Sequence, residues 1–348
     1  MTAPATPAPS AKPAPPRGAR PWFRRTFRRP ITAWRLVSLT TAFVLLNSML
    51  LGIPSFGTLG SMRWLLLPNA SCRYLANAPT NCWFYNLQSG LTDGWNDAYV
   101  PVLMFVLVVV LLVLALGRGW CGWGCPLGYS QYLIGRARAR LGVRYHELPY
   151  WAVALLDHGK YAIMFVMVVV AISVGMPALG LGAFDERLAL PFCQVCPGKP
   201  LFTGLQLVVG LQPFTTSIPF VAILMLVILL VGAFMVRMFW CRLCPIGAFM
   251  ALFNRRSLLW LRKDTTKCTK CRVCLRVCPM DIEEIFVEMD HENVTAPECI
   301  MCGRCVESCP EEGCLSFNLL GQELARSRSL ATRTAECARP PETEEAEM

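Results

Sequence analysis

Histidine is scarce in this sequence, which contains only His146, His158 and His291 among 348 residues. A membrane b-type haem normally takes two axial histidines from facing helices, and no long apolar run of this chain contains one. So few histidines also leave little room for a Ser-His-Asp arrangement. The sequence therefore predicts no haem and no hydrolase of that type.

Charged residues are scarce as well, since 16% of the residues are Asp, Glu, Lys or Arg while 54% are hydrophobic. The mean hydropathy of +0.44 is too high for an ordinary soluble protein. Residues 36–62, 98–117, 161–184 and 201–236 contain no charged side chain. A spanning helix needs about 20 predominantly apolar residues, so each of the first three runs is predicted to cross a membrane once.

The fourth uncharged run is too short for two spans and a turn. Pro213 and Pro219 divide it, which leaves 217–236 as the fourth span and makes 201–212 an interfacial or re-entrant segment. No span contains Asp or Glu, so an intramembrane proton relay is not expected. Residues 34–257 are thus predicted to form an α-helical membrane domain of four transmembrane helices.

Nucleotide-binding motifs are missing too. The sequence has no P-loop, and its one match to G-x-G-x-x-G, residues 117–122, follows an apolar run and not a strand. We treat that match as chance and predict no binding of NAD or ATP.

Basic residues gather in three stretches, before the first predicted span, between the second and third, and after the fourth. The positive-inside rule therefore places both termini in the cytoplasm of a multi-pass protein of the cell inner membrane. Basic side chains beside the spans would face anionic lipid headgroups, which accounts for the net charge of +10 without nucleic acid. Residues 1–33, which are basic and rich in Pro and Ala, and the acidic residues 323–348 are expected to be disordered.

Eight of the 18 cysteines form two identical motifs near the C-terminus. Each has the spacing C-x2-C-x2-C-x3-C-P, which binds [4Fe-4S] clusters in bacterial two-cluster ferredoxins, where the fourth cysteine ligates the other cluster. A zinc site or a disulfide framework does not require the same triple twice, 31 residues apart. Residues 258–322 are therefore expected to form an α+β ferredoxin domain with two [4Fe-4S] clusters. The predicted ligand sets are Cys268, Cys271, Cys274 and Cys309 for cluster 1, and Cys299, Cys302, Cys305 and Cys278 for cluster 2.

Further cysteines lie at the ends of the predicted spans. Cys121 and Cys125 follow the second span, and Cys241 and Cys244 follow the fourth, so four thiols converge on the cytoplasmic side if those spans pack together. Such a set could bind a cluster or zinc, act as redox pairs, or simply pack. The opposite side holds Cys72 and Cys82, which we expect to form a disulfide, and Cys193 and Cys196, whose role stays open. Cys314 is expected to be a buried thiol near its cluster, and Cys337 an idle one.

The chain resembles the NapH/MauN-type membrane-bound ferredoxins, which are related to the C-terminal half of NosR. The resemblance runs from about Arg35 to Phe317 and rests on three features: R-G-W-C-G-W-G-C-P at 118–126, F-W-C-R-L-C-P-I-G-A-F at 239–249, and the doubled ferredoxin motif. It implies a four-helix membrane anchor with a cytoplasmic two-cluster domain that passes electrons between the quinone pool and a partner redox system. Cys241 and Cys244 depart from the C-x3-C-P spacing that is common in the family.

The expected function is therefore that of a membrane-anchored electron-transfer protein, with membrane lipid, the quinone pool and a redox protein as partners and no nucleic acid. Whether it is itself an enzyme, such as a quinol dehydrogenase component, stays open. The alternatives are an accessory or regulatory factor that supplies electrons for metalloenzyme assembly, and a docking anchor with structural clusters.

Overall fold

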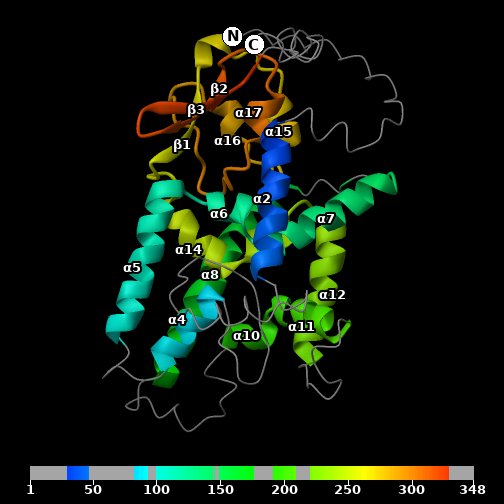
Figure 1. Ribbon diagram of the computed structural model, residues 1–348, viewed down its shortest axis with the longest axis vertical. Coiled ribbons are helices and arrows are strands. Elements are labelled where there is room, and N and C mark those ends of the chain that lie inside the picture. The colour runs from blue at the N-terminus through cyan, green and yellow to red at the C-terminus, as the bar shows by residue number, and fades with distance from the viewer. Residues whose placement is uncertain are drawn as a thin grey trace, which may run out of the picture.

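The computed structural model describes residues 30–46, 82–92, 99–143, 145, 149–175, 191–208 and 220–328. They form a bundle of helices with a small α+β domain stacked on one end (Figure 1). The mostly helical architecture and the C-terminal α+β domain confirm these two parts of the predicted fold class. The helices of the bundle are α2 (Pro30–Leu46), α4 (Trp83–Thr92), α5 (Tyr99–Leu116), α6 (Gly119–Trp123), α7 (Pro126–Arg140), α8 (Tyr150–Gly175), α10 (Pro191–Val195), α11 (Gly198–Val208), α12 (Phe220–Met235), α13 (Phe239–Leu243) and α14 (Pro245–Asn254).

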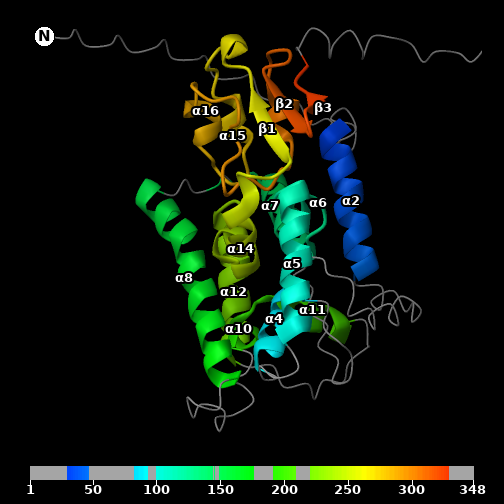
Figure 2. The same cartoon turned by 90° about the vertical axis from the view of Figure 1, so that its left-hand side faces the viewer.

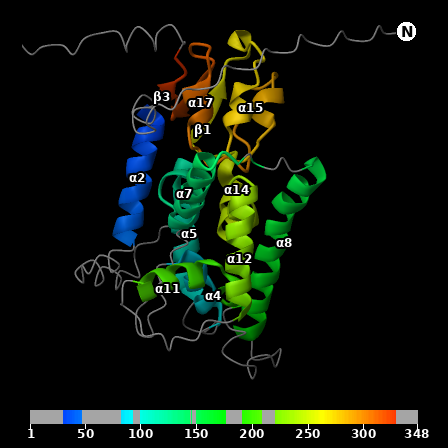
Figure 3. The same cartoon turned by 90° about the vertical axis from the view of Figure 1, so that its right-hand side faces the viewer.

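Each of the four predicted membrane spans overlaps one of these helices, namely α2, α5, α8 and α12. Among the described residues, one helix, Trp151–Val174, is both long and apolar enough to cross a membrane. The other apolar helices are shorter, at Pro30–Leu46, Val102–Leu116, Phe220–Met235 and Pro245–Asn254. Residues 47–62 and 176–184 of the predicted spans lie outside the described residues. Helix α11 begins before the predicted interfacial segment and runs across the long helices (Figure 3).

The bundle contains the same helical unit twice. A long apolar helix, a one-turn helix and a third helix follow one another as α5–α6–α7 and again as α12–α13–α14. The two units pack crosswise, because α5 contacts α14 and α12 contacts α7. Pro126 and Pro245 begin α7 and α14, which suits a residue with a preset φ and no N–H to donate. Cys125 and Cys244 are consequently the N-cap residues of these two helices.

The small domain contains an antiparallel sheet of three strands in the order β1 (Leu259–Lys263), β2 (Leu315–Leu319) and β3 (Gln322–Arg326). Between β1 and β2 lie four short helices: η5 (Thr265–Lys267), α15 (Val273–Val277), α16 (Glu284–Val287) and α17 (Arg304–Ser308). The sheet and the helices enclose one core (Figure 2).

The structure corrects two predicted boundaries. The acidic tail was expected from residue 323, but β3 continues to Arg326, because Leu320 and Gly321 both adopt positive φ and turn the chain back onto β2. The N-terminal segment was expected to be disordered up to residue 33, but α2 already begins at Pro30. There the Thr32 hydroxyl donates to the Glu307 carboxylate of α17, so α2 is held by the small domain.

Candidate functional site

The two cysteine motifs fold into loops of the same shape. In the first loop Lys270 and Arg272 have φ of 52° and 58°, and in the second Met301 and Gly303, 31 residues later, have φ of 49° and 71°. Residues in the left-handed region turn successive backbone N–H groups toward one concave side, which favours an anionic group. The two copies of the sequence motif therefore adopt the same backbone conformation.

Three cysteines of the first motif and one of the second line a common cavity. Its walls include Cys268, Cys271, Cys274 and Cys309, together with Cys314. Cys309 is the C-cap residue of α17, which packs against the α15 helix of the first motif. Crossed ligation requires the last cysteine of one motif to lie next to the first three cysteines of the other, as Cys309 does here. Cys278, the last cysteine of the first motif, does not line this cavity.

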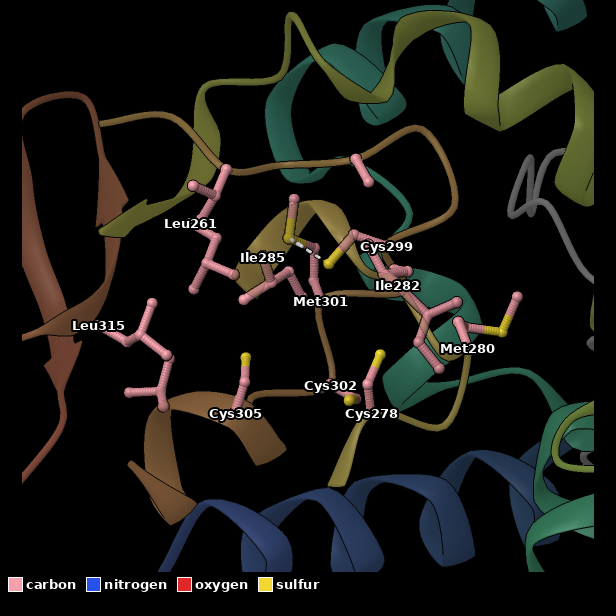
Figure 4. Close-up of a cluster of buried hydrophobic side chains, with 14 of the residues drawn as sticks. Leu261, Cys278, Met280, Ile282, Ile285, Cys299, Met301, Cys302, Cys305 and Leu315 are labelled. Atoms are coloured by element: carbon pink, nitrogen blue, oxygen red, sulfur yellow. Dashed lines mark hydrogen bonds between the residues drawn. The ribbon is translucent and has the colours of Figure 1, made fainter. Parts of the chain in front are cut away.

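The other four cysteines of the two motifs are all buried. Figure 4 shows the side chains of Cys278, Cys302 and Cys305 next to one another, with Cys299 in the adjacent loop. Burial, followed by the nearby Cys302 thiol, raises the pKa of Cys278 to about 11 and that of Cys299 to about 12. Unliganded, these thiols would be protonated at neutral pH, and metal binding would have to displace their protons.

Backbone N–H groups point at the sulfurs in both sets. Cys278 accepts from Met280 and Ile282, Cys299 accepts from Met301, and Cys309 accepts from Glu311. Hydrogen bonds of this type to sulfur tune the potential of an iron–sulfur cluster. The donor geometry therefore fits thiolate ligands that carry negative charge.

Cys314 lies beside the first set, as the sequence suggested. Its thiol donates to Cys309 and lowers the pKa of Cys309 to about 6. The same thiol proton can instead be donated to the carbonyl oxygen of Asp264, which lies 3.6 Å from Cys314 Sγ.

No three His, Cys, Asp or Glu side chains among the described residues are arranged to hold a single metal ion. Thiolates around one zinc ion lie about 3.8 Å apart, given a Zn–S bond of about 2.3 Å and tetrahedral angles. The four thiolates of a cubane bind four different irons and lie farther apart, so a cluster needs no such close group.

The second set faces the helical bundle. The Trp123 indole of α6 donates to the carbonyl of Met301 over 2.8 Å. The Asn254 amide of α14 donates to the carbonyls of Ala296 and Cys299, both over 2.9 Å. At Gly122 an added Cβ would lie 2.2 Å from the carbonyl oxygen of Ile300, so only glycine allows α6 to approach the cluster loop this closely.

Ion pairs with buried basic partners hold the two parts together. Glu298 pairs with Arg118 over 2.8 Å and also with Lys160 of α8. Asp281 pairs with Arg242 over 2.8 Å and with Arg237 over 3.2 Å. Arg118, Lys160 and Arg242 are completely buried.

The position of these arginines corrects a prediction. Arg35, Arg118 and Arg242 were expected to face lipid headgroups, but all three are buried at the contact with the small domain. They lie there because the small domain supplies Glu298 and Asp281, and because Gly122 supplies a carbonyl to Arg35 over 2.7 Å.

The structure brings together Cys121, Cys125, Cys241 and Cys244, which we call the junction thiols. They are close enough that their charges affect one another. Burial raises the pKa of Cys241 to about 11 and that of Cys244 to about 12. Cys121 Sγ lies 3.7 Å from the sulfur of Met250. The sequence predicted this convergence only on the condition that the second and fourth spans pack together.

Polar groups around the junction thiols were not predicted. Gln131 Nε2 donates to Cys241 Sγ over 3.4 Å, and its Oε1 accepts from the Trp240 N–H over 2.8 Å. Nε of Arg118, together with Nε and Nη1 of Arg242, has no hydrogen-bond partner among the residues that the structure describes. Buried donors without acceptors are costly, and an anionic thiolate centre would accept from them.

The remaining candidates lie away from the ferredoxin domain, outside the described residues, or on the surface. Cys82, Cys193 and Cys196 lie in the bundle, whereas Cys72, and with it the predicted Cys72–Cys82 disulfide, lies outside the described residues, as do Cys337 and His146. His158 is part of α8, and His291 is an exposed residue of the small domain whose ring contacts Glu288.

Two family profiles match the chain. The profile described as "4Fe-4S dicluster domain" matches residues 261–310. The profile described as "4Fe-4S binding domain" matches residues 98–144 and 218–267, and therefore covers both helical units that carry the junction thiols. No solved structure matches the chain.

Several proteins are similar to a large part of this chain. The protein MJ0750 of Methanocaldococcus jannaschii is 32% identical over 68% of this chain and 86% of its own. The ferredoxin-type protein NapH of Escherichia coli is 27% identical over 80% of this chain and 87% of its own. The regulatory protein NosR of Stutzerimonas stutzeri is 27% identical over 61% of this chain and 26% of its own. Together with the two profiles, these relatives show that the chain belongs to the NapH-type family of 4Fe-4S ferredoxin proteins.

Proposed function

We propose that this protein is a membrane-anchored carrier that passes electrons between the quinone pool and a partner redox protein through two [4Fe-4S] clusters. Cluster 1 would be held by Cys268, Cys271, Cys274 and Cys309, and cluster 2 by Cys299, Cys302, Cys305 and Cys278. The observation that carries the proposal is the cavity lined by three cysteines of one motif and the last cysteine of the other. When bound, each cluster would take up and release one electron.

The chain holds the two ligand sets in a defined order. Cys271 is exposed at the surface of the small domain, whereas the second set is buried beside α6 and α13. Arg35 lies between the second set and the junction thiols, because it is close to both Cys302 and Cys241. Cluster 1 therefore faces outward to a soluble partner, and cluster 2 faces the junction thiols. We extend the path to the junction thiols as a third redox or metal position.

Exposed basic side chains surround the first set. Lys267, Lys270, Arg272 and Arg276 all lie near Cys271 in the sequence and are solvent-accessible. A basic rim attracts a partner with an acidic surface and raises its association rate. We therefore propose an acidic redox protein as the partner of cluster 1.

The apolar outer surface of the bundle supports a membrane location. Leu103, Leu107 and Leu111 of α5 are 64%, 47% and 57% exposed, and Phe165 of α8 and Phe220 of α12 are 68% and 77% exposed. Aliphatic and aromatic surface of this extent is costly in water and matches the lipid core. We propose that each of the four spans includes one of the helices α2, α5, α8 and α12. The ferredoxin domain would then lie in the cytoplasm.

The test is electron exchange with quinones in lipid vesicles. The full chain, purified without oxygen, is mixed with a naphthoquinol and then with the corresponding quinone, while cluster reduction is followed by EPR. The proposal predicts that the reduced fraction changes with the quinol-to-quinone ratio. Clusters that dithionite reduces but that ignore this ratio at every potential would contradict a quinone-linked role.

A role in metalloenzyme maturation or regulation is the second candidate, favoured by the cysteines outside the ferredoxin motifs. Substitution of Cys193 and Cys196 distinguishes the two. Loss of metal from a client metalloenzyme, with quinol exchange intact, would favour maturation.

A further inference from the structure

A second cavity lies in the bundle on the side of the junction thiols away from the ferredoxin domain, and we call it the outer cavity. Four cysteines line it, namely Cys82, Cys193, Cys196 and Cys244. They come from the residue before α4, from α10 and the turn after it, and from the N-cap of α14. Helices α4, α10 and α11 lie at the end of the bundle opposite the sheet (Figures 1 and 3).

The outer cavity is built in the same way as the junction-thiol site. Phe192-Cys-x-x-Cys-Pro197 repeats the pattern of Trp240-Cys-x-x-Cys-Pro245, and in both a one-turn helix gives way to a new helix at the proline or the residue after it. The Cys-x-x-Cys pair itself is visible in the sequence, where its role stayed open.

A buried glutamine holds each copy. Gln88 Oε1 accepts from the Phe192 N–H over 3.1 Å, just as Gln131 Oε1 accepts from the Trp240 N–H over 2.8 Å. Each glutamine also donates to the carbonyl four residues earlier in its own helix. Burying a polar glutamine side chain in an otherwise apolar core costs free energy. Packing alone does not require it, which indicates that each glutamine positions its Cys-x-x-Cys pair.

The lining of the outer cavity suits a thiolate-ligated centre. Cys82 Sγ accepts hydrogen bonds from the backbone N–H groups of Phe84 and Tyr85. Lys199, which is 6% exposed, is the one charged side chain among the described residues that line the cavity, and a cation in this wall would offset negative charge on thiolate ligands.

The set of sulfurs matches an iron–sulfur cluster better than a single ion. Four cysteines from separate segments surround one cavity here, as they do at the first ferredoxin set. In neither place are three thiols arranged for a single metal ion. Soft thiolates that are spread around a cavity can instead be bridged by several irons and sulfides.

We propose that the outer cavity binds an iron–sulfur cluster, with Cys82, Cys193 and Cys196 as ligands and Cys244 as the fourth sulfur. The inference rests on the proposed electron-transfer function and extends it. Cys244 belongs to both sites, so the thiol sites form a continuous series from the ferredoxin domain to the opposite end of the bundle. One electron would be exchanged with the ferredoxin-domain clusters, without making or breaking a covalent bond.

The test compares metal contents of the full chain, purified and reconstituted without oxygen. The double variant Cys193→Ser/Cys196→Ser is matched with Tyr85→Phe, which changes the cavity wall but no thiol. Iron, acid-labile sulfide, zinc and copper are counted per chain, and EPR monitors the ferredoxin clusters. We expect the double variant to lose about two to four irons and as many sulfides, while Tyr85→Phe and the ferredoxin signal stay at the wild-type level.

Equal iron in the double variant and in Tyr85→Phe would overturn the proposal. So would a loss of zinc or copper in place of iron, or a loss of quinol exchange at full iron content. If the double variant does not fold, Cys82→Ser takes its place with the same expected loss. Absence of the ferredoxin EPR signal from the wild type would refute the proposed function itself, and the iron difference would still decide the outer cavity.

Discussion

Cys314 shows how a residue outside the cysteine motifs can act on a proposed cluster ligand. Its thiol donates to Cys309, and a hydrogen bond to a ligand sulfur stabilises the reduced, more negative cluster. Cys314→Ala should therefore lower the reduction potential of cluster 1 by about 40 mV, which corresponds to one hydrogen bond of about 1 kcal/mol. An EPR-monitored redox titration measures this shift. Cys314→Ser retains a donor and should shift the potential less, so equal shifts in the two variants would rule out the hydrogen bond as the cause.

Lys270 tests the docking role of the basic rim. Lys270→Glu should slow reduction of cluster 1 by a sulfonated, anionic viologen by up to about tenfold at low salt, and it should speed reduction by a cationic viologen. Stopped-flow absorbance at two salt concentrations measures both rates. Arg326→Glu places the same charge change on exposed β3 and is the matched control. Equal effects of the two substitutions would mean that net charge matters and the rim does not.

Individual residues also mark the limit of sequence reasoning. The eight ferredoxin cysteines could be predicted from their spacing, because the whole pattern lies within one segment of the chain. Gln88, Gln131 and Arg242 could not be assigned in that way, because their roles depend on partners 39 to 109 residues away. For Gln131, its place shortly after Cys125-Pro126 was the available signal.

At the scale of elements, the contact between the bundle and the ferredoxin domain depends on Glu298. Removing one member of a buried ion pair costs about 3–5 kcal/mol, because its partner charges stay buried. Glu298→Gln should therefore loosen the domain contact and make the segment around Leu258 more sensitive to limited proteolysis. Glu284→Gln breaks an exposed ion pair with Arg255 and should have little effect. An unchanged proteolysis rate in Glu298→Gln would mean that the ion pairs of Glu298 do not hold the two domains together.

The same carboxylate gives the interface a pH dependence. Burial raises the pKa of Glu298, but Arg118 and Lys160 together lower it below its ordinary value of 4.5. A carboxylate whose pKa is lowered in the folded state stabilises the contact above its ordinary pKa, and this stabilisation is lost as the pH falls through the lowered value. We expect the proteolysis rate of the wild type to stay constant from neutral pH down to about 4.5 and to rise below it. A rise that begins between pH 7 and 5 would contradict this assignment.

The long apolar helices could be predicted from their composition, while their ends and the short helices between them could not. Uncharged runs predicted the positions of α5, α8 and α12, because about 20 apolar residues have few other uses. Strand β3 was missed because Gln322–Arg326 has no apolar alternation and is held by pairing with β2. The start of α2 was missed because contact with the ferredoxin domain, which a sequence does not display, holds it in place.

At the scale of the whole molecule, the thiols form a series of four sites. The first ferredoxin set faces solvent and the second faces the bundle. The junction thiols lie in α6 and α13 and at the N-caps of α7 and α14, and the outer cavity lies beyond them. The sequence identified the cysteines of all four sites, but only the three-dimensional packing places them in this order. Such a series suits a protein that moves electrons from one side of a membrane domain to the other.

The most direct measurement of the central claim is the iron content of Cys309→Ala beside that of the wild type, each purified without oxygen and examined by Mössbauer spectroscopy. Because Cys309 belongs to the second motif but is assigned to cluster 1, the account predicts a loss of about four irons. The signal of cluster 2 should survive, although that cluster takes its other cysteines from the same motif. Loss of cluster 2 with cluster 1 intact would contradict the crossed arrangement, and an iron-free wild type would contradict the account as a whole.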